Sequence, residues 1–336
     1  MTPPTAGRAR TDEREPTIAV VIPCHNEEAF VGTVVRDFAA TLPTAQIYVY
    51  DNASTDSTAD RAREAGAITC AEPRKGKGNA VRRMFADVDA DIYVMVDGDA
   101  TYDPATAPSM VKMLLEQNLD MIVAARRAHE NDEGVYRKGH TSGNAWFTRM
   151  IRRLFGGEFS DVLSGYRVMS RRFVKSLPVF SEGFEIETEL SAHAVRVRAA
   201  CDEVPTQYRS RGDGSLSKLR TYRDGFRILL HIIRLYEEMR PLQFFTFCGA
   251  VLTAIALGLG IPVIDEFART GLVLRFPTAI LALGIQIVAF ICLTAGIILR
   301  SVGRTRDEAR RLVYLSLPPP SSLDLPATSP RAAPGS

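Results

Sequence analysis

Two aspartates, Asp97 and Asp99, are the residues whose type and spacing most directly suggest chemistry. They stand one residue apart in the stretch VMVDGDATYDP, directly after a run of apolar and β-branched residues typical of a buried strand. Two like charges in such a place are costly unless a cation lies near them. Divalent cations take oxygen ligands and commonly bridge a diphosphate. The pair therefore predicts a metal site, although a turn or helix-cap role would also account for it.

Several familiar motifs do not fit this chain. An EF-hand calcium loop starting at Asp97 would need glycine at its sixth position and glutamate at its twelfth, where the chain has Tyr102 and Pro108. The segment GKGN is not the P-loop pattern GxxxxGK[ST], and no GxGxxG opens the first predicted helix. A bound nucleotide must therefore be held in another way.

Length and composition set the broad class of protein. The 336 residues are 46% hydrophobic and 24% charged, enough for one large or two modest domains with a core. A net charge of +2 gives no reason to expect a nucleic-acid partner. The five cysteines are scattered without a CxxC pair, which fits a reducing compartment and predicts no zinc site.

The elements that must position the aspartates alternate along the chain. Strands are predicted over 17–23, 46–51, 67–71, 91–97 and 120–126, and helices over 27–41, 55–65, 77–86 and 105–117. This alternation predicts an α/β fold with a mostly parallel sheet flanked by helices. Ligands of such sheets lie beyond the carboxyl ends of the strands.

Polar and charged residues, together with one proline, gather at those strand ends. Each one alone is explained by a cap or a turn, but their common place on one sheet edge predicts a site. They are, in strand order, Pro23, Asn26 and Glu27; Asp51; Lys77; Asp97 and Asp99; and Arg126.

Two segments, 242–264 and 278–299, carry no charged residue. At about 1.5 Å per residue each is long enough to span a hydrocarbon core of roughly 30 Å, although two buried core helices remain an alternative. Arginines and lysines flank the pair on both outer sides, which predicts that both chain ends are cytoplasmic at the inner membrane. The N-terminus (1–16) has no apolar leader and is predicted to be disordered, and 300–336 is predicted to be basic and then disordered.

An amphipathic helix is predicted over 219–241, just before the first apolar segment. Its apolar residues recur at helical spacing on one face, and its charged residues on the other. Such a helix can rest among lipid headgroups or pack on the soluble domain, and the pattern does not decide between the two.

A series of motifs carries a resemblance to a known family. VIPCHNEE, YDNASTDST, VDGDATYDP, LSGYRVMSRRF, FEIETEL and GSLSKLRTYRDGFRIL occur in that order. Together they resemble the inverting GT-A glycosyltransferases of family 2, in the subgroup that makes polyprenyl-phosphate sugars, including the dolichol-phosphate mannose synthases. The resemblance covers about residues 17–240 and implies a GT-A catalytic domain over 17–218.

The resemblance also implies roles for individual residues. Pro23, Asn26, Glu27, Asp51 and Lys77 would bind the nucleotide sugar, and Asp97 and Asp99 would hold Mg²⁺ or Mn²⁺ against its diphosphate. Thr101, where many relatives have glutamine, would be a further, weaker metal ligand. Arg126 would meet the acceptor phosphate, with Arg137 or Lys138 as a second basic residue. Ser142, Arg211 and Lys218 would also contact the acceptor phosphate. The implied catalytic residues are Asp97, Asp99, Arg126, Arg167 and Lys218.

Elementary chemistry supports such a reaction. A phosphate monoester has a second pKa near 6, so the acceptor is largely a dianion at neutral pH and needs no strong base. The enzyme must mainly overcome repulsion between two anions, which a metal on one side and arginines on the other can do. The expected partners are a UDP- or GDP-hexose, polyprenyl phosphate, the lipid bilayer and a possible second copy of the chain.

Other activities are alternatives to polyprenyl-phosphate glycosyl transfer. Processive synthases use a QxxRW motif, but the single tryptophan, Trp146, lies in GNAWF. A non-catalytic, membrane-bound scaffold that binds sugar nucleotides, or a glycosyltransferase with a different acceptor, remains an alternative. The sequence does not predict which nucleotide or which sugar is used.

Overall fold

The structure is a computed structural model that describes residues 15–127, 160–183, 185–208, 236–237 and 240–320. The chain forms two compact units, one of Met1–Ser215 with Arg310–Ser336 and one of Leu216–Ala309. Most of the predicted amphipathic helix over 219–241, and of the predicted disordered N-terminus over 1–16, lies outside the described residues. Each unit is considered by itself below.

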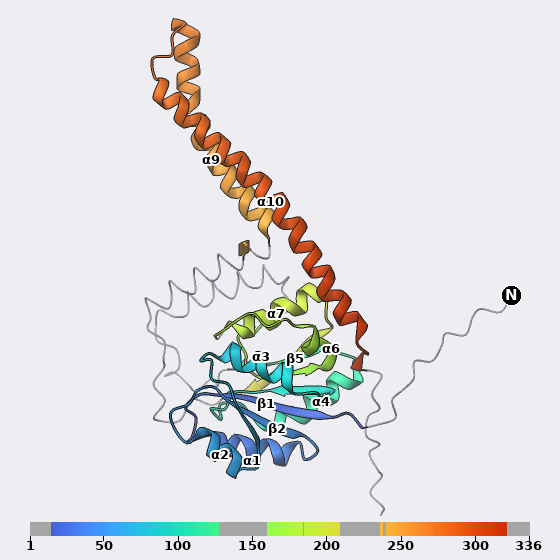
Figure 1. Cartoon of the computed structure of the whole chain (residues 1–336). Coiled ribbons are helices and arrows are strands. Elements are labelled where there is room, and N and C mark those ends of the chain that lie inside the picture. The colour runs from blue at the N-terminus through green and yellow to red at the C-terminus, as the bar shows by residue number, and fades with distance from the viewer. Residues whose placement is uncertain (1–14, 128–159, 184, 209–235, 238–239, 321–336) are drawn as a thin grey trace, which may run out of the picture. The chain divides into compact units, whose positions relative to one another are not determined.

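The first unit is built on a mixed sheet of seven strands (Figure 1). Its order is β3-β2-β1-β4-β6-β5-β7, with β6 antiparallel to its neighbours β4 and β5 and the other pairs parallel. Met95 and Val123 both pair with Arg167. The strands are β1 Ile18–Cys24, β2 Gln46–Asp51, β3 Ile68–Ala71, β4 Ile92–Met95, β5 Met121–Arg127, β6 Arg167–Ser170 and β7 Cys201–Gln207.

Helices cover both faces of this sheet. On one face lie α1 Val31–Thr41, α2 Thr58–Glu64 and α4 Ala107–Glu116, the last preceded by the short turn η1 Pro104–Thr106. On the other face lie α3 Lys77–Asp87, α6 Arg171–Ser176 and α7 Ile186–Val197 (Figure 1). The sequence explains the packing of α1, because its apolar residues recur every three or four positions. The buried ones are Val31, Val34, Val35 and Phe38.

The predicted mostly parallel sheet with flanking helices is confirmed, and all five predicted strands are present. The strands β6 and β7 are additions that the sequence did not predict. The order of the sheet reverses at β1, which has β2 on one side and β4 on the other. The carboxyl ends of β1 and β4 therefore border a switch point, where open α/β sheets bind ligands.

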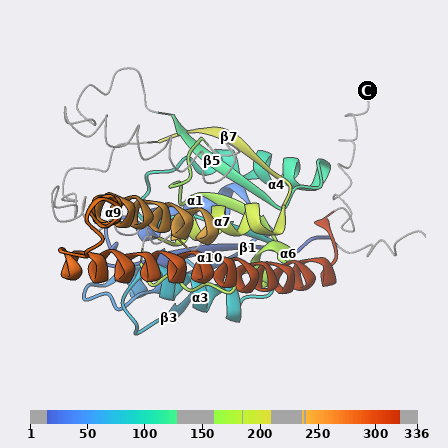
Figure 2. The ribbon, with the colours of Figure 1, turned by 90° about the horizontal axis from the view of Figure 1, so that it is seen from above.

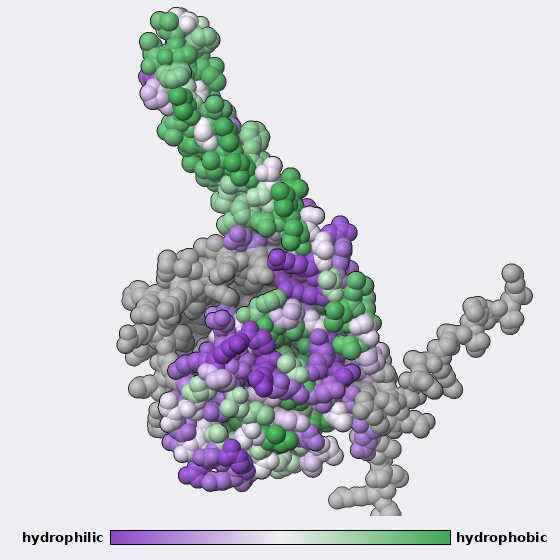
Figure 3. Space-filling view, viewed as in Figure 1, coloured by the Kyte–Doolittle hydropathy of each residue, from purple (hydrophilic) through white to green (hydrophobic). Residues whose placement is uncertain are grey.

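The second unit contains most of two long helices, α9 Pro241–Thr270 and α10 Phe276–Ser316, which include the predicted spans 242–264 and 278–299. Their most apolar windows have mean hydropathies of 2.2 and 2.4, and only 17% of each window is buried. Figure 3 shows apolar side chains over most of the visible surface of the apolar segments of both helices. Such exposure does not fit core helices of a soluble protein. Both helices are long and apolar enough to cross a membrane.

The two helices lie side by side (Figures 1 and 2). A Cβ at Gly249 of α9 would lie 3.2 Å from the carbonyl oxygen of Ala289 in α10, so the backbones approach closely. Gln286, the main polar residue of the second apolar segment, donates to the hydroxyl of Thr253 at 3.4 Å. The helix α10 also runs on to Ser316, so the first part of the predicted basic and disordered tail is helical.

Candidate active site

The loop after β4 carries the acidic pair and is held in a tight conformation. Gly98 lies between the two aspartates, where a Cβ would be only 2.4 Å from the sulfur of Cys24. Asp99 is 8% exposed, and its Oδ1 accepts hydrogen bonds from the Thr101 amide at 3.2 Å and the Thr101 hydroxyl at 2.6 Å. In this structure Thr101, itself 1% exposed, therefore fixes the carboxylate of Asp99.

Lys77 joins Asp97 to a second carboxylate. Its ammonium group donates to Asp97 and, at 2.5 Å, to Glu187 of α7. Burial alone would lower the pKa of Lys77, but the two carboxylates raise it above its ordinary value, so the side chain is a cation. Glu187 was not assigned from the sequence, although it lies in the FEIETEL motif that carries the resemblance.

The LSGYR motif lies beside Asp97 because β6 is antiparallel. The start of an antiparallel strand lies at the same edge as the ends of its parallel neighbours. A Cβ at Gly165 would be 2.5 Å from Oδ2 of Asp97, so glycine keeps the space beside this carboxylate open. The Gly165 amide donates to the hydroxyl of Tyr102 at 3.0 Å, which ties the motif to the loop after β4.

Two asparagines connect the loops that follow β1, β2 and β3. Asn26 has a positive φ of 55°, and its Oδ1 accepts from the Thr55 amide at 2.8 Å. Asn52 is buried and its Oδ1 accepts from the Gly76 amide at 2.6 Å. The three loops are therefore one connected edge, and the side-chain oxygen of Asn26 is used within the protein.

The remaining predicted donor-binding residues lie at the same edge. Pro23 is buried near the end of β1, and Asp51 ends β2. Burial raises the pKa of the Cys24 thiol, and four nearby carboxylates raise it further. In order of effect these are Glu27, Asp97, Asp51 and Asp99. The structure thus brings together the acidic residues that the sequence placed on one edge.

Arg126 at the end of β5 is paired with Asp161. Its Nε and Nη2 atoms donate to the two carboxylate oxygens, each at 2.8 Å, and its guanidinium lies 5.5 Å from the ring centroid of Tyr208. Burial would lower the pKa of Arg126, but Asp161 raises it. Glu203 of β7 holds this loop by accepting from the amides of Ser160 and Asp161 at 2.8 and 3.2 Å.

An aromatic pair connects the basic and acidic parts of the edge. The ring centroids of Tyr208 and Tyr102 lie 5.4 Å apart, in an edge-on arrangement. Tyr208 contacts Arg126, and Tyr102 follows the acidic pair in sequence. Burial raises the pKa of Tyr102 to about 12, so its hydroxyl stays protonated at neutral pH. Asp161 and Tyr208 were not assigned from the sequence, because no local pattern marks them.

Arg167, predicted to be catalytic, is fully buried. Its guanidinium donates to the carbonyl oxygens of Ser164 at 3.0 Å, Val162 at 2.7 Å and Glu187 at 2.9 Å, and to the Ser191 hydroxyl at 3.0 Å. Burial lowers the pKa of Arg167. All these partners lie in the protein interior, so Arg167 stabilises the site by holding together the loop and helix next to it.

Five predicted acceptor-site residues lie outside the described residues. They are Arg137, Lys138, Ser142, Arg211 and Lys218.

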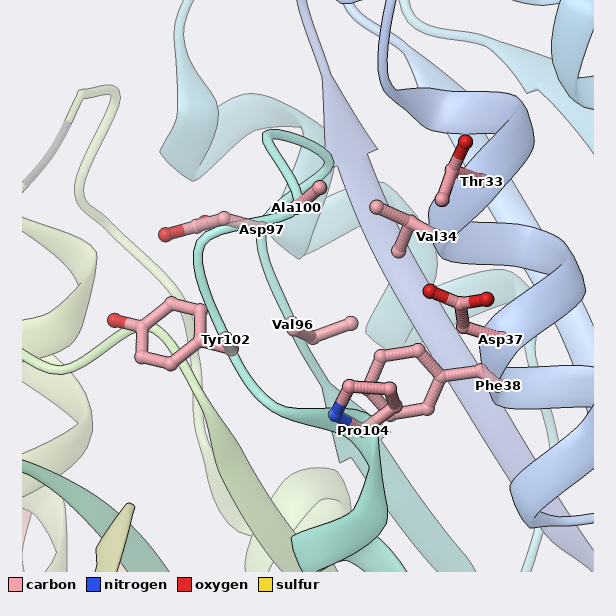
Figure 4. Close-up of a pocket in the computed structure, with 9 residues that line it drawn as sticks. All are labelled: Thr33, Val34, Asp37, Phe38, Val96, Asp97, Ala100, Tyr102 and Pro104. Atoms are coloured by element: carbon pink, nitrogen blue, oxygen red, sulfur yellow. The ribbon is translucent and has the colours of Figure 1, made fainter. Parts of the chain in front are cut away.

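Figure 4 shows a small cavity between α1 and the loop after β4. The carboxylate of Asp97 and the hydroxyl of Tyr102 point to one side there, away from Thr33 and Asp37 on α1. The carboxylate of Asp97 thus faces away from α1.

The acidic pair fits a divalent cation chemically. Within the described ranges no three or more His, Cys, Asp or Glu side chains come together as a metal site. The pair itself offers hard carboxylate oxygens, which Mg²⁺ and Mn²⁺ prefer. Asp97 keeps 27% of its side chain exposed, and Gly165 leaves space beside it. A cation bound here would complete its coordination with oxygens from a ligand or from water.

The seven-stranded sheet with an acidic pair at its switch point defines an α/β protein of the GT-A type. Residues 19–177 match glycosyl transferase family 2. The chain is 33% identical over 251 residues to glycosyltransferase AglJ of Haloferax volcanii, with 74% of this chain and 82% of that protein covered. The chain therefore belongs to glycosyl transferase family 2.

Two further relatives have lipid phosphates in their names. Dolichyl-phosphate hexose transferase of Haloferax volcanii is 27% identical over 223 residues (66% of this chain, 95% of that protein). Dodecaprenyl-phosphate galacturonate synthase of Rhizobium johnstonii is 25% identical over 311 residues (87% and 90%). The resemblance to polyprenyl-phosphate glycosyltransferases is thus confirmed.

A solved structure shares the fold. Glucosyl-3-phosphoglycerate synthase from Mycobacterium tuberculosis, in complex with Mn²⁺, UDP-glucose and phosphoglyceric acid, is 26% identical with a TM-score of 0.53. The match covers 65% of this chain and 79% of that one. A protein of this fold therefore binds a nucleotide sugar together with a divalent metal.

Proposed function

We propose that the protein transfers a hexosyl group from UDP- or GDP-hexose to polyprenyl phosphate, with inversion. The main observation behind this proposal is that an acidic pair of residues and a basic residue lie on the same edge of the sheet. Asp97 and Asp99 lie at one end of the aromatic pair Tyr102–Tyr208, and Arg126 lies at the other. Such an edge can hold a metal-bound diphosphate beside an acceptor phosphate.

The chain's own residues bind and orient the reactants in this proposal. Asp97 and Asp99 would hold Mg²⁺ or Mn²⁺, which supplies charge neutralisation for the leaving diphosphate. Pro23, Glu27 and Asp51 line the nucleotide side. Lys77 adds positive charge beside the diphosphate.

The acceptor phosphate binds to Arg126 and attacks as a dianion, so the protein needs no strong base. Arg137, Lys138, Ser142, Arg211 and Lys218 are proposed to complete this acceptor site. Three residues act through others: Thr101 orients Asp99, Asn26 joins two loops, and Arg167 holds the loop beside Asp97.

The reaction is proposed to occur at a membrane, and the two long apolar helices support this. In the proposal α9 and α10 span the inner membrane and both chain ends stay on the cytoplasmic side, as the flanking arginines favour. The nucleotide sugar is water-soluble and its acceptor is a lipid, so the catalytic unit must work at the membrane surface.

A donor screen tests the proposal. The full chain in detergent is incubated with Mn²⁺, polyprenyl phosphate and a panel of labelled UDP- and GDP-hexoses, and the lipid phase is analysed. We expect a labelled sugar lipid from at least one donor. If no donor gives a product, the proposed reaction is wrong.

Asp99→Asn tests the metal role. We expect transfer to fall by at least about a hundredfold, because an amide is a poor ligand for a hard cation. Folding should persist, since the asparagine oxygen can still accept from Thr101. Asp103→Asn is the matched control, because Asp103 caps η1 through the Ala105 amide at 3.1 Å and asparagine can do the same. Near-normal turnover in Asp99→Asn would remove the metal role.

A further inference from the structure

The end of α10 contacts the catalytic fold through one buried side chain. Residues 310–316, called here the terminal segment, belong to the same compact unit as the sheet. Tyr314 is 5% exposed, and its hydroxyl donates to Oδ2 of Asp120 at 2.6 Å. Its neighbours Leu312 and Leu315 are 69% and 59% exposed. The contact is therefore specific to Tyr314 and is not a general apolar packing of the helix.

The carboxylate of Asp120, which accepts from the Tyr314 hydroxyl, is held in place by several other partners. Its side chain is 0% exposed, and Arg172 pairs with both carboxylate oxygens at 2.5 and 2.9 Å. The Ser170 hydroxyl and the Ala200 amide donate to it at 3.0 and 3.2 Å. A buried carboxylate needs such partners, and these four bonds satisfy it without Tyr314. The tyrosine adds a bond that can form or break while the cluster stays intact.

Two further contacts hold the terminal segment. The Arg172 guanidinium lies 4.7 Å from the ring centroid of Tyr314, at cation–π distance. Arg311 donates to the carbonyl oxygen of Val197, the last residue of α7, at 2.7 Å. A cation at the C-terminal end of a helix is favourable because carbonyl groups there lack partners.

The anchored elements are those that carry site residues at their other ends. Asp120 directly precedes β5, which ends at Arg126 and Arg127. Arg172 lies in α6, just after β6 and Arg167. Val197 ends α7, whose first turn carries Glu187. The terminal segment thus touches the ends of β5, β6 and α7 that lie away from the site residues of these elements.

We propose that the terminal segment is a docking element that fastens the end of the second apolar helix to the catalytic unit. The catalytic unit is joined to the apolar helices covalently before α9 and by this contact at the end of α10. Resting on the proposed function, the contact ties the strand that carries Arg126 to the helix proposed to span the membrane.

Hydrogen exchange of the full chain in lipid nanodiscs tests the docking. The nanodiscs contain phosphatidylethanolamine and phosphatidylglycerol, and exchange is followed in peptides that cover 310–316. In Tyr314→Phe we expect these amides to exchange at least about tenfold faster than in the wild type, because a charge-assisted hydrogen bond is lost. Arg311→Ala, which leaves the Asp120 cluster intact, should act in the same direction.

Leu312→Ala is the matched control, since this exposed residue lies in the same turn and should leave exchange unchanged. Peptides from β1 and β4 report on the rest of the fold. Equal exchange in Tyr314→Phe and the wild type would overturn the proposal. Uniform acceleration across the unit would also overturn it, because Tyr314 would then support the whole fold. Exchange is read without turnover, so the result does not depend on the proposed reaction.

Discussion

At the scale of single residues, the ammonium group of Lys77 balances the charges of two carboxylates in the site. It lies between Asp97 and Glu187, whose side chains are 27% and 6% exposed. Carboxylates so poorly hydrated repel each other unless a cation lies between them. Lys77 therefore stabilises the fold as well as serving the proposed donor site.

Replacing Lys77 tests this balance. We expect Lys77→Met to lower the free energy of unfolding by about 3 kcal/mol, because two acids lose their partner. Glu187→Gln in the same chain should restore part of the loss, since one buried charge is then removed. Chemical denaturation of the full chain in detergent, followed by circular dichroism, measures both variants. Strictly additive effects would contradict the pairing.

His193 of α7 makes stability depend on pH. Burial is the main cause that lowers its pKa to about 3, from an ordinary value near 6.5, with Arg310 and Arg196 adding to it. Its Nε2 pairs with the Ser176 hydroxyl at 2.9 Å, and its Nδ1 has no partner among the described residues. Below pH 6.5 the unfolded chain binds a proton that the folded chain excludes, so stability falls as the pH falls toward 3.

The loss of stability at low pH can be measured as the difference in the free energy of unfolding between two pH values. Between pH 7 and pH 5 we expect the wild type to lose about 2 kcal/mol through this group. His193→Gln cannot bind the proton and should lose correspondingly less over the same range. If the two proteins lose equal stability, the histidine is not responsible.

At the scale of elements, the start of α3 is fixed by direct backbone packing. The Gly78 amide donates to the carbonyl oxygen of Glu182 at 3.0 Å. A Cβ at Gly78 would lie 2.1 Å from the Ser181 carbonyl oxygen. The GKGN segment therefore needs glycine for close approach to this loop, which in turn leads to Glu187.

Gly78→Ala should consequently cost about 3 kcal/mol or more of unfolding free energy, because two backbones must separate. Gly32→Ala is the control, since a Cβ there meets the flexible end of Arg36 at 3.4 Å and the carbonyl oxygen of Arg61 only at an ordinary contact distance of 3.7 Å. In the helix α1 this change should gain up to about 1 kcal/mol. Thermal unfolding in detergent compares the two. An equal effect of both substitutions would contradict the packing argument.

The elements differ in how far the sequence predicts them. Strands β1, β2 and β4 are dense in buried apolar residues and could be read directly. Strand β7, CDEVPTQ, contains charges and a proline, and it forms because it pairs with β5 over seven residues. Propensity alone cannot predict a strand whose stability comes from a partner some eighty residues away.

The residues of the site also differ in how far the sequence predicts them. Residues at or just beyond the carboxyl end of a strand, such as Arg126 and Asp97, could be found from periodicity and the family motifs. Asp161 lies in no such pattern, and Glu187, although it is part of the FEIETEL motif, acts through a partner distant in the chain. Lys77 and Glu187, for example, are 110 residues apart. The burial of Arg167 could not be predicted from the sequence either, since backbone carbonyl partners leave no pattern in the sequence.

At the scale of the whole molecule, α9 and α10 pack through glycines. A Cβ at Gly296 would lie 2.9 Å from the Cβ of Phe245, so we expect Gly296→Leu to push the helices apart and cost about 1–3 kcal/mol. Gly258→Leu is the control, because the described residues place nothing within 4 Å of a Cβ there. A sodium dodecyl sulfate titration measures the unfolding midpoint. Equal midpoints for the two variants would contradict this packing.

The four-residue strand β6 lies between the strands of the donor side, β1 to β4, and those of the acceptor side, β5 and β7. A slip of one residue in its pairing would move Arg126 by about 3.3 Å relative to Asp97 and turn the strand's side chains to the opposite face. Arg167 pairs with Met95 of β4 and with Val123 of β5, and its buried guanidinium fastens this position of β6 to four oxygens of the preceding loop and of α7. The residue at which the two halves of the sheet meet is therefore also held from outside the sheet, and the spacing between the acidic and basic groups depends on this one position.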